Sequence, residues 1–283
     1  SRRATPRSSP VAYPVKKALQ VLWVWLGETE PKGDPADLIA GTYLAEQEFY
    51  SSYTRDLPYA YDSLVENLAD VSHIPFAHHG LQGTRDDAAP ITQSISKVLL
   101  SSEQSTAVTT GGATADLMTF DFADRTMGMN RKASFFLKSP FFFYYLGQFE
   151  GKMAEAGATG FTAQAAKSGS DKEEGRPFRL NVICIPVSPG VSRLILLNAK
   201  KPGSDDFLSK LPRWVAHLFA NRFLDSDLAF LHYQERNLRA SPRGTGVQEW
   251  NSGYFMPAES DRSISAWRSW LAKEGGRCVL PGP

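Results

Sequence analysis

Two histidines five residues apart, His73 and His78, and a distant aspartate, Asp227, are the residues of this 283-residue chain that best suit metal chemistry. Two neutral imidazoles and one carboxylate on one side of a ferrous ion leave neighbouring coordination positions open for oxygen and for reaction beside a substrate. The same ligand types also suit zinc, so a zinc hydrolase is an alternative. The sequence therefore predicts a mononuclear metal site, and ligand chemistry alone does not choose the metal.

The two histidines follow a segment with helical periodicity that is expected to begin after Asp62, a residue type that often caps helices. Pro75 is expected to end this helix soon after His73, so that His78 folds back beside His73. Polar residues at three- and four-residue spacing form one stripe of the helix, and such a stripe usually faces water: Ser63, Glu66, Asn67, Asp70 and His73. The pattern allows a two-histidine clamp, with a solvated face as the plain alternative.

Asp227 differs from Asp225 in its position on the helix predicted for residues 211–239. Asp227 shares a stripe at helical spacing with apolar residues: Ala220, Phe223, Leu224, Leu228 and Leu231. A carboxylate on an apolar face is costly to bury unless it is paired or binds a metal. Asp225 falls among polar residues, as a solvated side chain would. Asp227 is thus the predicted third ligand, and a buried salt bridge or a helix cap is its alternative role.

The remaining elements predict the fold that positions these residues. Strand-forming segments separated by polar turns lie between residues 93 and 137, and residues 181–200 continue the pattern around a Ser-Pro-Gly turn. The stretch 157–176 is rich in glycine and charge and is expected to be a mobile loop. Helices are expected at 211–239 and 263–271. The sequence predicts an α+β fold, an antiparallel β-sheet covered by helices.

Residues 135–149 include eight aromatic side chains. Packing in a core or an interface is the common role of such a cluster. A flat apolar wall or a membrane-facing lip for a large planar substrate is the functional alternative.

Composition excludes several classes of function. A formal net charge of +1 gives no broad basic field, so no nucleic-acid partner is expected. The two cysteines, Cys184 and Cys278, match no Cys-x-x-Cys or Cys-x-His pattern, so thiolates can build neither a zinc site nor an iron–sulfur cluster. No apolar run is long enough to span a bilayer.

Four longer stretches of the chain are distinctive: RDLPYAYDSLVENLADVSHIPFAHHG, CIPVSPGVSRLI, PRWVAHLFANRFLDSDLAFLHYQE and YFMPAESDRSISAWRSWL. They resemble the Rieske-type non-haem iron oxygenases of chlorophyll metabolism, the family of pheophorbide a oxygenase and chlorophyllide a oxygenase. The resemblance covers roughly residues 13–271 and implies a helix-grip-like Rieske oxygenase catalytic domain. It implies that residues 1–37 are remnant strands of a Rieske-type domain and a linker, and that residues 38–283 form the mononuclear-iron catalytic domain.

By this resemblance His73, His78 and Asp227 are the iron ligands. Asp70 matches the acid that, in this family, links the iron site to a Rieske histidine across a subunit boundary. Three further residues are expected beside the ligands or the substrate: Asn67, His79 and Gln234.

The Rieske motif itself, Cys-x-His followed by Cys-x-x-His, is missing from the 283 residues. We therefore expect a natural subunit that works beside a partner carrying the [2Fe–2S] Rieske cluster, with ferredoxin as electron donor, in a trimer-based hetero-oligomer. The expected activity is oxidation of a ring methyl of chlorophyllide a to a formyl group. The alternatives are ring-opening oxygenation of pheophorbide a and a non-catalytic scaffold or pigment-binding subunit. The resemblance also implies a chloroplast location, with association at the thylakoid or inner envelope membrane.

Overall fold

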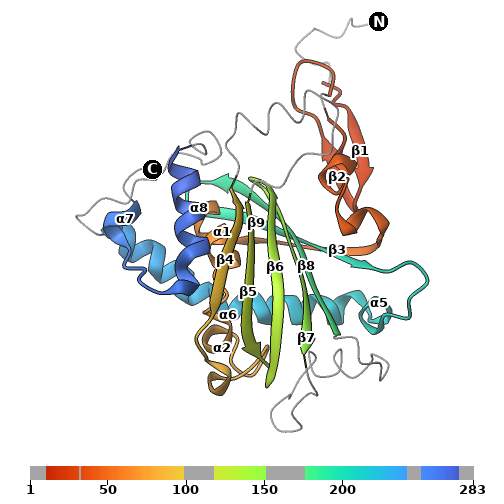
Figure 1. The fold of residues 1–283 in the computed structure, drawn as a ribbon. Coiled ribbons are helices and arrows are strands. Elements are labelled where there is room, and N and C mark those ends of the chain that lie inside the picture. Colours follow the sequence, from red (N-terminus) through yellow and green to blue (C-terminus); the bar gives the residue numbers. More distant parts are fainter. Residues whose placement is uncertain (1–10, 32, 99–117, 151–175, 241–249, 274–283) are drawn as a thin grey trace, which may run out of the picture.

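The computed structural model describes residues 11–31, 33–98, 118–150, 176–240 and 250–273. Its main feature is a seven-stranded antiparallel sheet in the order β3-β9-β8-β7-β6-β5-β4 (Figure 1). The strands of this sheet are β3 (Glu48–Leu57), β4 (Thr92–Val98), β5 (Met118–Thr126), β6 (Met129–Ser139), β7 (Phe142–Glu150), β8 (Arg176–Ser188) and β9 (Val191–Lys200). A separate two-stranded sheet pairs β1 (Val15–Ala18) with β2 (Val21–Val24).

The helices are α1 (Tyr61–Ala69), α2 (Ile74–Ala77), α5 (Phe207–Lys210), α6 (Arg213–Ala240), α7 (Trp250–Gly253) and α8 (Arg262–Lys273). Residues of α1, α6 and α8 pack against one face of the large sheet. Short 3-10 segments are η2 (Pro35–Leu38), η3 (Tyr43–Glu46), η4 (Arg85–Asp87) and η6 (Glu259–Asp261). This architecture confirms the predicted α+β fold.

Each face of the sheet has its own apolar core, because successive side chains of a strand point to opposite faces. Phe143 and Tyr145 belong to the cluster that includes residues of α1, α6 and α8. Phe142 and Tyr144 belong to a second cluster, and Trp23 of the β1–β2 hairpin packs against that cluster. The aromatic cluster of residues 135–149 therefore serves mainly as core packing.

The hairpin predicted within residues 181–200 is present as β8 and β9. Gly190 lies in the turn at a φ of +73°, a left-handed conformation that glycine adopts without steric cost. The predicted mobile loop at 157–176 lies almost entirely outside the described residues, as do residues 99–117 of the predicted strand region. The division at residue 37 stays a prediction.

Helix α1 begins and ends earlier than the sequence suggested. Its N-cap is Ala60 instead of Asp62, and the Ala60 N–H donates to the Glu235 carboxylate on α6 at 2.6 Å. The helix ends at Ala69, with Asp70 as C-cap. The prediction that Pro75 ends this helix was wrong: Pro75 sits in the first turn of α2, where the N–H that proline lacks is not needed.

The polar stripe of α1 does not face water. Ser63 and Glu66 are buried, and the Glu66 carboxylate contacts Gln234 of α6 and Arg268 of α8. The stripe thus joins helices across the buried side of α1.

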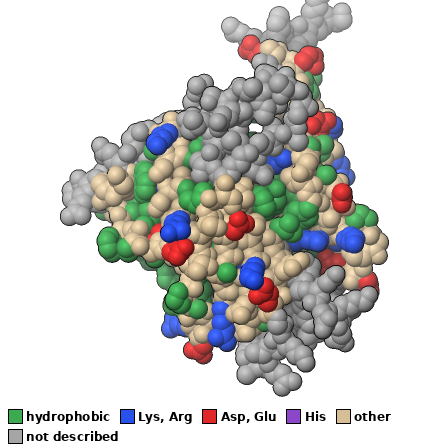
Figure 2. Space-filling model, in the orientation of Figure 1, with side chains coloured by type: hydrophobic (Ala, Val, Ile, Leu, Met, Phe, Trp, Pro, Cys, Tyr) green, Lys and Arg blue, Asp and Glu red, His purple; other side chains and the backbone are tan. Residues whose placement is uncertain are grey.

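The path of the chain explains why the histidines lie on this face. Strand β3 occupies one edge of the sheet and β4 the opposite edge, so the connection that contains α1 and α2 crosses from edge to edge (Figure 1). The His73–His78 segment is part of this connection. In the described part of the chain, no helix has the length and apolar composition needed to cross a membrane. On the face shown in Figure 2, charged side chains of both signs are scattered among neutral and apolar ones, in keeping with the small net charge.

Candidate metal centre

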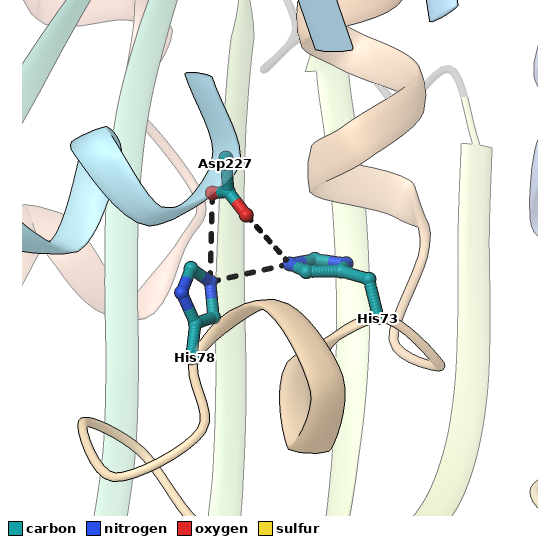
Figure 3. Close-up of side chains that lie close together, drawn as sticks. All are labelled: His73, His78 and Asp227. Atoms are coloured by element: carbon teal, nitrogen blue, oxygen red, sulfur yellow. Dashed lines mark hydrogen bonds and ion pairs between the residues drawn. The ribbon is translucent and has the colours of Figure 1, made fainter. Parts of the chain in front are cut away.

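His73, His78 and Asp227 converge at one point between α2 and α6 (Figure 3). The two imidazole Nε2 atoms are 3.2 Å apart. The Asp227 carboxylate places Oδ1 3.8 Å from Nε2 of His73 and Oδ2 3.5 Å from Nε2 of His78. The structure therefore brings together the three residues that the sequence singled out.

The turn between α1 and α2 holds the first histidine. The Asp70 carboxylate accepts hydrogen bonds from the N–H of Ser72 at 2.7 Å and from its hydroxyl at 2.6 Å, which fixes the chain just before His73. His73 is the N-cap of α2, and its carbonyl accepts from the N–H of Ala77 at 2.8 Å. His78 is the C-cap of the same short helix. One turn of helix therefore brings the two imidazoles side by side.

Helix α6 supplies the third residue from its buried stripe. Asp227 is 3% exposed and Leu231, one turn later, is also buried, which confirms the predicted apolar face. Asp225 instead points outward and pairs with Arg55 at 2.5 Å. The distinction drawn between the two aspartates is thus confirmed.

Two observations fit a metal ion: the distances between the three side chains, and polar atoms of the triad that lack hydrogen-bond partners. Ligand atoms that lie about 2.0–2.2 Å from one ion are roughly 2.8–3.1 Å apart at 90° and roughly 3.3–3.6 Å apart at tetrahedral angles. The two imidazoles at 3.2 Å and the His78–Asp227 pair at 3.5 Å lie within this span, and the His73–Asp227 pair at 3.8 Å is slightly wider. Among the described residues, neither Oδ1 of Asp227 nor Nδ1 of His73 has a hydrogen-bond partner. A buried carboxylate oxygen without a donor is costly, and a bound cation would remove that cost.

The electrostatic environment keeps the imidazole of His78 in the form that binds metals. Burial, together with His73, lowers the pKa of His78 to about 3, so the ring is neutral. Burial raises the pKa of Asp227 to about 6, while His73 and Asn67 oppose the rise and Asp70 adds to it. A bound cation would favour the ionised carboxylate.

A cavity of about 220 Å³ adjoins the triad. Its lining includes His73 and Asp227 together with Glu66, Asn67 and Asp70. His73 and Asp227 line this cavity and His78, with 2% of its side chain exposed, does not, so the centre meets the cavity through His73 and Asp227.

Asp70 lies beside His73, with Oδ2 3.7 Å from Nδ1 of the ring. Its position on the Nδ1 side, opposite the metal-facing Nε2, is that of a group able to orient the imidazole.

The other predicted site residues fare differently. Asn67 and Gln234 line the cavity, and Gln234 also donates to Glu66 at 2.9 Å. His79 is exposed and accepts a hydrogen bond from the N–H of Arg85 at 3.1 Å, away from the triad. The roles of these three residues stay predictions.

Sequence reasoning missed two residues near the centre. Ser226 lies next to Asp227 in the chain, and its hydroxyl is 2.7 Å from Nδ1 of His78. The side chain of Tyr59 is fully buried, and its hydroxyl has no hydrogen-bond partner in the described part of the chain. Burial raises the pKa of Tyr59, and the charge of Asp227 adds to the rise. Adjacency to the predicted ligand was a signal for Ser226; nothing in the sequence pattern indicated Tyr59.

Comparison with known proteins supports the family suggested by the sequence. A family model described as pheophorbide a oxygenase matches residues 158–244. The protochlorophyllide-dependent translocon component 52 of Arabidopsis thaliana is 31% identical, covering 92% of this chain and 47% of the relative. Flavonoid 8-hydroxylase 2 of Ocimum basilicum is 27% identical over 94% of this chain and 46% of its own. Pheophorbide a oxygenase of Arabidopsis thaliana is 26% identical over 96% and 46%.

All three relatives are named as chloroplastic, and this chain spans just under half the length of each. Among solved structures, dicamba monooxygenase bound to dicamba superposes with a TM-score of 0.50 at 13% identity, covering 92% of this chain and 70% of that one. This likeness identifies the fold as that of a Rieske oxygenase catalytic domain. The chain thus matches the pheophorbide a oxygenase family model over residues 158–244 and is similar to a pheophorbide a oxygenase over 96% of its length, which supports its resemblance to the Rieske-type non-haem iron oxygenases of chlorophyll metabolism.

Proposed function

We propose that this chain provides the mononuclear-iron catalytic centre of a Rieske-type oxygenase that acts on a chlorophyll-type tetrapyrrole. The observation that carries the proposal is the buried triad of His73, His78 and Asp227, whose metal-facing atoms lie 3.2–3.8 Å apart. The resemblance to Rieske-type non-haem iron oxygenases favours iron over zinc, a choice that the ligand types alone do not make.

The Nε2 atoms of both histidines and the Asp227 carboxylate would hold the ion. A ferrous ion with this ligand set supplies oxygen activation, because it keeps coordination positions open. The chain's own residues prepare the site: burial keeps His78 neutral, and α6 presents Asp227 from an apolar face that excludes water.

Asp70 is proposed to orient His73 and to connect the centre to the incoming electron. Its Oδ1 is held by Ser72, while Oδ2 stays near Nδ1 of His73. In this proposal the electron comes from a [2Fe–2S] Rieske cluster, whose Cys-x-His and Cys-x-x-His ligand motif is not among these 283 residues. We propose a partner subunit that carries this cluster and receives electrons from ferredoxin, in a trimer-based hetero-oligomer.

Two substrates are proposed. The family model and the Arabidopsis relative favour pheophorbide a and opening of its macrocycle. Chlorophyllide a, with a ring methyl oxidised to formyl, is the alternative substrate. We propose a chloroplast location, in keeping with the names of the relatives; association with the thylakoid or inner envelope membrane is part of the same proposal.

Iron binding tests the proposal first. Anaerobic loading with Fe(II), followed by metal analysis, is expected to give one iron per wild-type chain and close to none in His73→Ala. The matched control is His232→Ala, because His232 is exposed on α6, contacts the carbonyl of Pro58 and should not affect iron binding. A non-catalytic scaffold would bind no stoichiometric iron and would tolerate the loss of His73.

The substrate is tested next in the complex reconstituted with its Rieske partner. Each pigment is supplied with a reduced electron donor and oxygen, and the products are identified by mass. Conversion of one pigment alone assigns the substrate, whereas conversion of neither by an iron-loaded complex contradicts the tetrapyrrole proposal.

A further inference from the structure

The Ser226 hydroxyl joins the backbone of α6 to His78, on the side of the imidazole ring that faces away from Asp227 and His73. It donates to the carbonyl of Phe223 at 2.6 Å, one turn earlier on α6. The same oxygen lies 2.7 Å from Nδ1 of His78. Because a serine hydroxyl has a single hydrogen, and the carbonyl can only accept, the serine oxygen must accept from the ring.

This arrangement determines the tautomer of His78. If Nδ1 carries the hydrogen, Nε2 of the neutral ring has a free lone pair. Nε2 is the atom that faces Asp227 at 3.5 Å and His73 at 3.2 Å. The hydrogen is therefore held on the side of the ring that faces away from the metal position.

Phe223 adds a second constraint. Its ring stacks on His78 with centroids 3.8 Å apart and an interplanar angle of 25°. Three residues in one turn of α6 thus surround His78: Phe223 stacks on its ring, Ser226 accepts the hydrogen of Nδ1, and Asp227 places its carboxylate near Nε2.

We infer that Ser226 is a positioning residue that holds His78 in the tautomer whose Nε2 binds the metal. The inference rests on the proposed function of the triad as an iron site. Partners of metal-bound histidines typically account for about 10–100-fold in metal affinity. Serines also bond back to their own helix for purely local reasons, which predicts no effect on the metal.

The chain contains a matched control for that local role. Ser209 on α5 donates to the carbonyl of Asp206, also three residues earlier, at 2.7 Å. Among the described contacts this hydroxyl has no histidine partner. Ser209→Ala therefore removes the same local bond without touching the centre.

The test compares wild type, Ser226→Ala, Ser226→Thr and Ser209→Ala as purified chains under anaerobic conditions. Fe(II) affinity is measured by competition with a chromophoric chelator, Co(II) substitution reports the ligand field through its absorption bands, and thermal unfolding without metal reports the fold. We expect Ser226→Ala to lose about 10-fold or more in Fe(II) affinity and to shift the Co(II) bands. Ser226→Thr should recover most of both, and Ser209→Ala should match wild type.

Wild-type affinity and an unshifted Co(II) spectrum in Ser226→Ala would overturn the inference while leaving the iron site intact. Equal losses in Ser226→Thr and Ser226→Ala would also overturn it, since the hydroxyl would then not be the cause. A wild-type chain that binds no metal would instead overturn the proposed function, and the inference with it.

Discussion

Two buried carboxylates of this protein, Glu66 and Asp227, are surrounded in opposite ways. Glu66 accepts from Arg268 at 2.6 Å, from Gln234 at 2.9 Å and from Tyr254 at 3.1 Å. Asp227 lies on the same helix as Gln234, two turns earlier, yet its Oδ1 accepts no hydrogen bond from any described residue.

The difference lies in where the compensating cation comes from. Burying a carboxylate is costly unless a positive group or several donors compensate it. Arg268 is that positive group for Glu66 and also pairs with Asp62, so this cluster is complete within the chain. The triad has only two histidines, and one of them is held neutral. The complete ion cluster indicates a structural role, and the incomplete one supports the proposed metal site.

Removing the internal cation should have the largest effect on folding. Arg268→Met leaves Glu66 and Asp62 without their partner and is expected to lower the free energy of unfolding by about 3–5 kcal/mol. Urea unfolding of the metal-free chain measures this loss. The control is Arg193→Met, because the Arg193–Asp56 pair has side chains 42% and 49% exposed and should contribute at most about 1 kcal/mol. Similar losses in both variants would remove the contrast between buried and surface pairs.

Fe(II) should stabilise the folded chain against unfolding in the wild type but much less when Asp227 is replaced. A site with free Fe(II) at 100 times its dissociation constant gains about 2.7 kcal/mol of stability. Asp227→Asn is expected to lose most of this gain, while its metal-free stability should not fall, because the substitution removes a buried charge whose Oδ1 accepts no hydrogen bond from a described residue. Thermal unfolding with and without Fe(II) separates the two effects. A large loss of stability in the metal-free variant would mean that Asp227 is compensated within the chain, as Glu66 is.

Asp70 should affect turnover more than binding. Asp70→Asn keeps a group beside Ser72 and His73 but removes the charge, so most iron should be retained. Coupled turnover with the Rieske partner is expected to fall by about 10–100-fold, the range seen when a partner of a metal-bound histidine is changed. Iron analysis and product formation are measured on the same samples. Unchanged turnover would remove Asp70 from the electron route.

Tyr59 should give the smallest effect. Its buried hydroxyl has no partner among the described residues, so Tyr59→Phe removes a polar group that contributes no internal hydrogen bond. The free energy of unfolding is expected to stay within about 1 kcal/mol of wild type or to rise. Tyr53→Phe is the contrast, because its hydroxyl donates to Asn221 at 2.6 Å. A clear loss in Tyr59→Phe alone would reveal a partner that the hydroxyl contacts in solution.

The sequence predicted the elements whose periodicity is strong. The stripe of α6 separated Asp227 from Asp225 because burial on a long helix follows a regular spacing. Alternating strands predicted the sheet for the same reason. The family resemblance supplied the ligand set and the choice of iron, which residue spacing alone left open.

Other features depended on tertiary contacts that local patterns do not contain. The polar stripe of α1 has the pattern of a solvated face, but Glu66 is buried, and Arg268, 202 residues later in the chain, compensates its charge. Helix α1 has Ala60 as its N-cap instead of Asp62, and the Ala60 N–H donates to the Glu235 carboxylate on α6, a contact that local sequence does not predict. Ser226 and Tyr59 gain their contacts from packing between distant elements: adjacency to Asp227 was the signal for Ser226, and no pattern indicated Tyr59.

The central claim is that one ion bridges His73, His78 and Asp227. A crystal structure of the anaerobically Fe(II)-loaded chain, with anomalous data collected at the iron edge, tests it most directly. We predict one anomalous peak about 2.0–2.2 Å from both Nε2 atoms and from a carboxylate oxygen of Asp227. Iron bound elsewhere, or a triad closed by hydrogen bonds with no peak between its members, would contradict the claim.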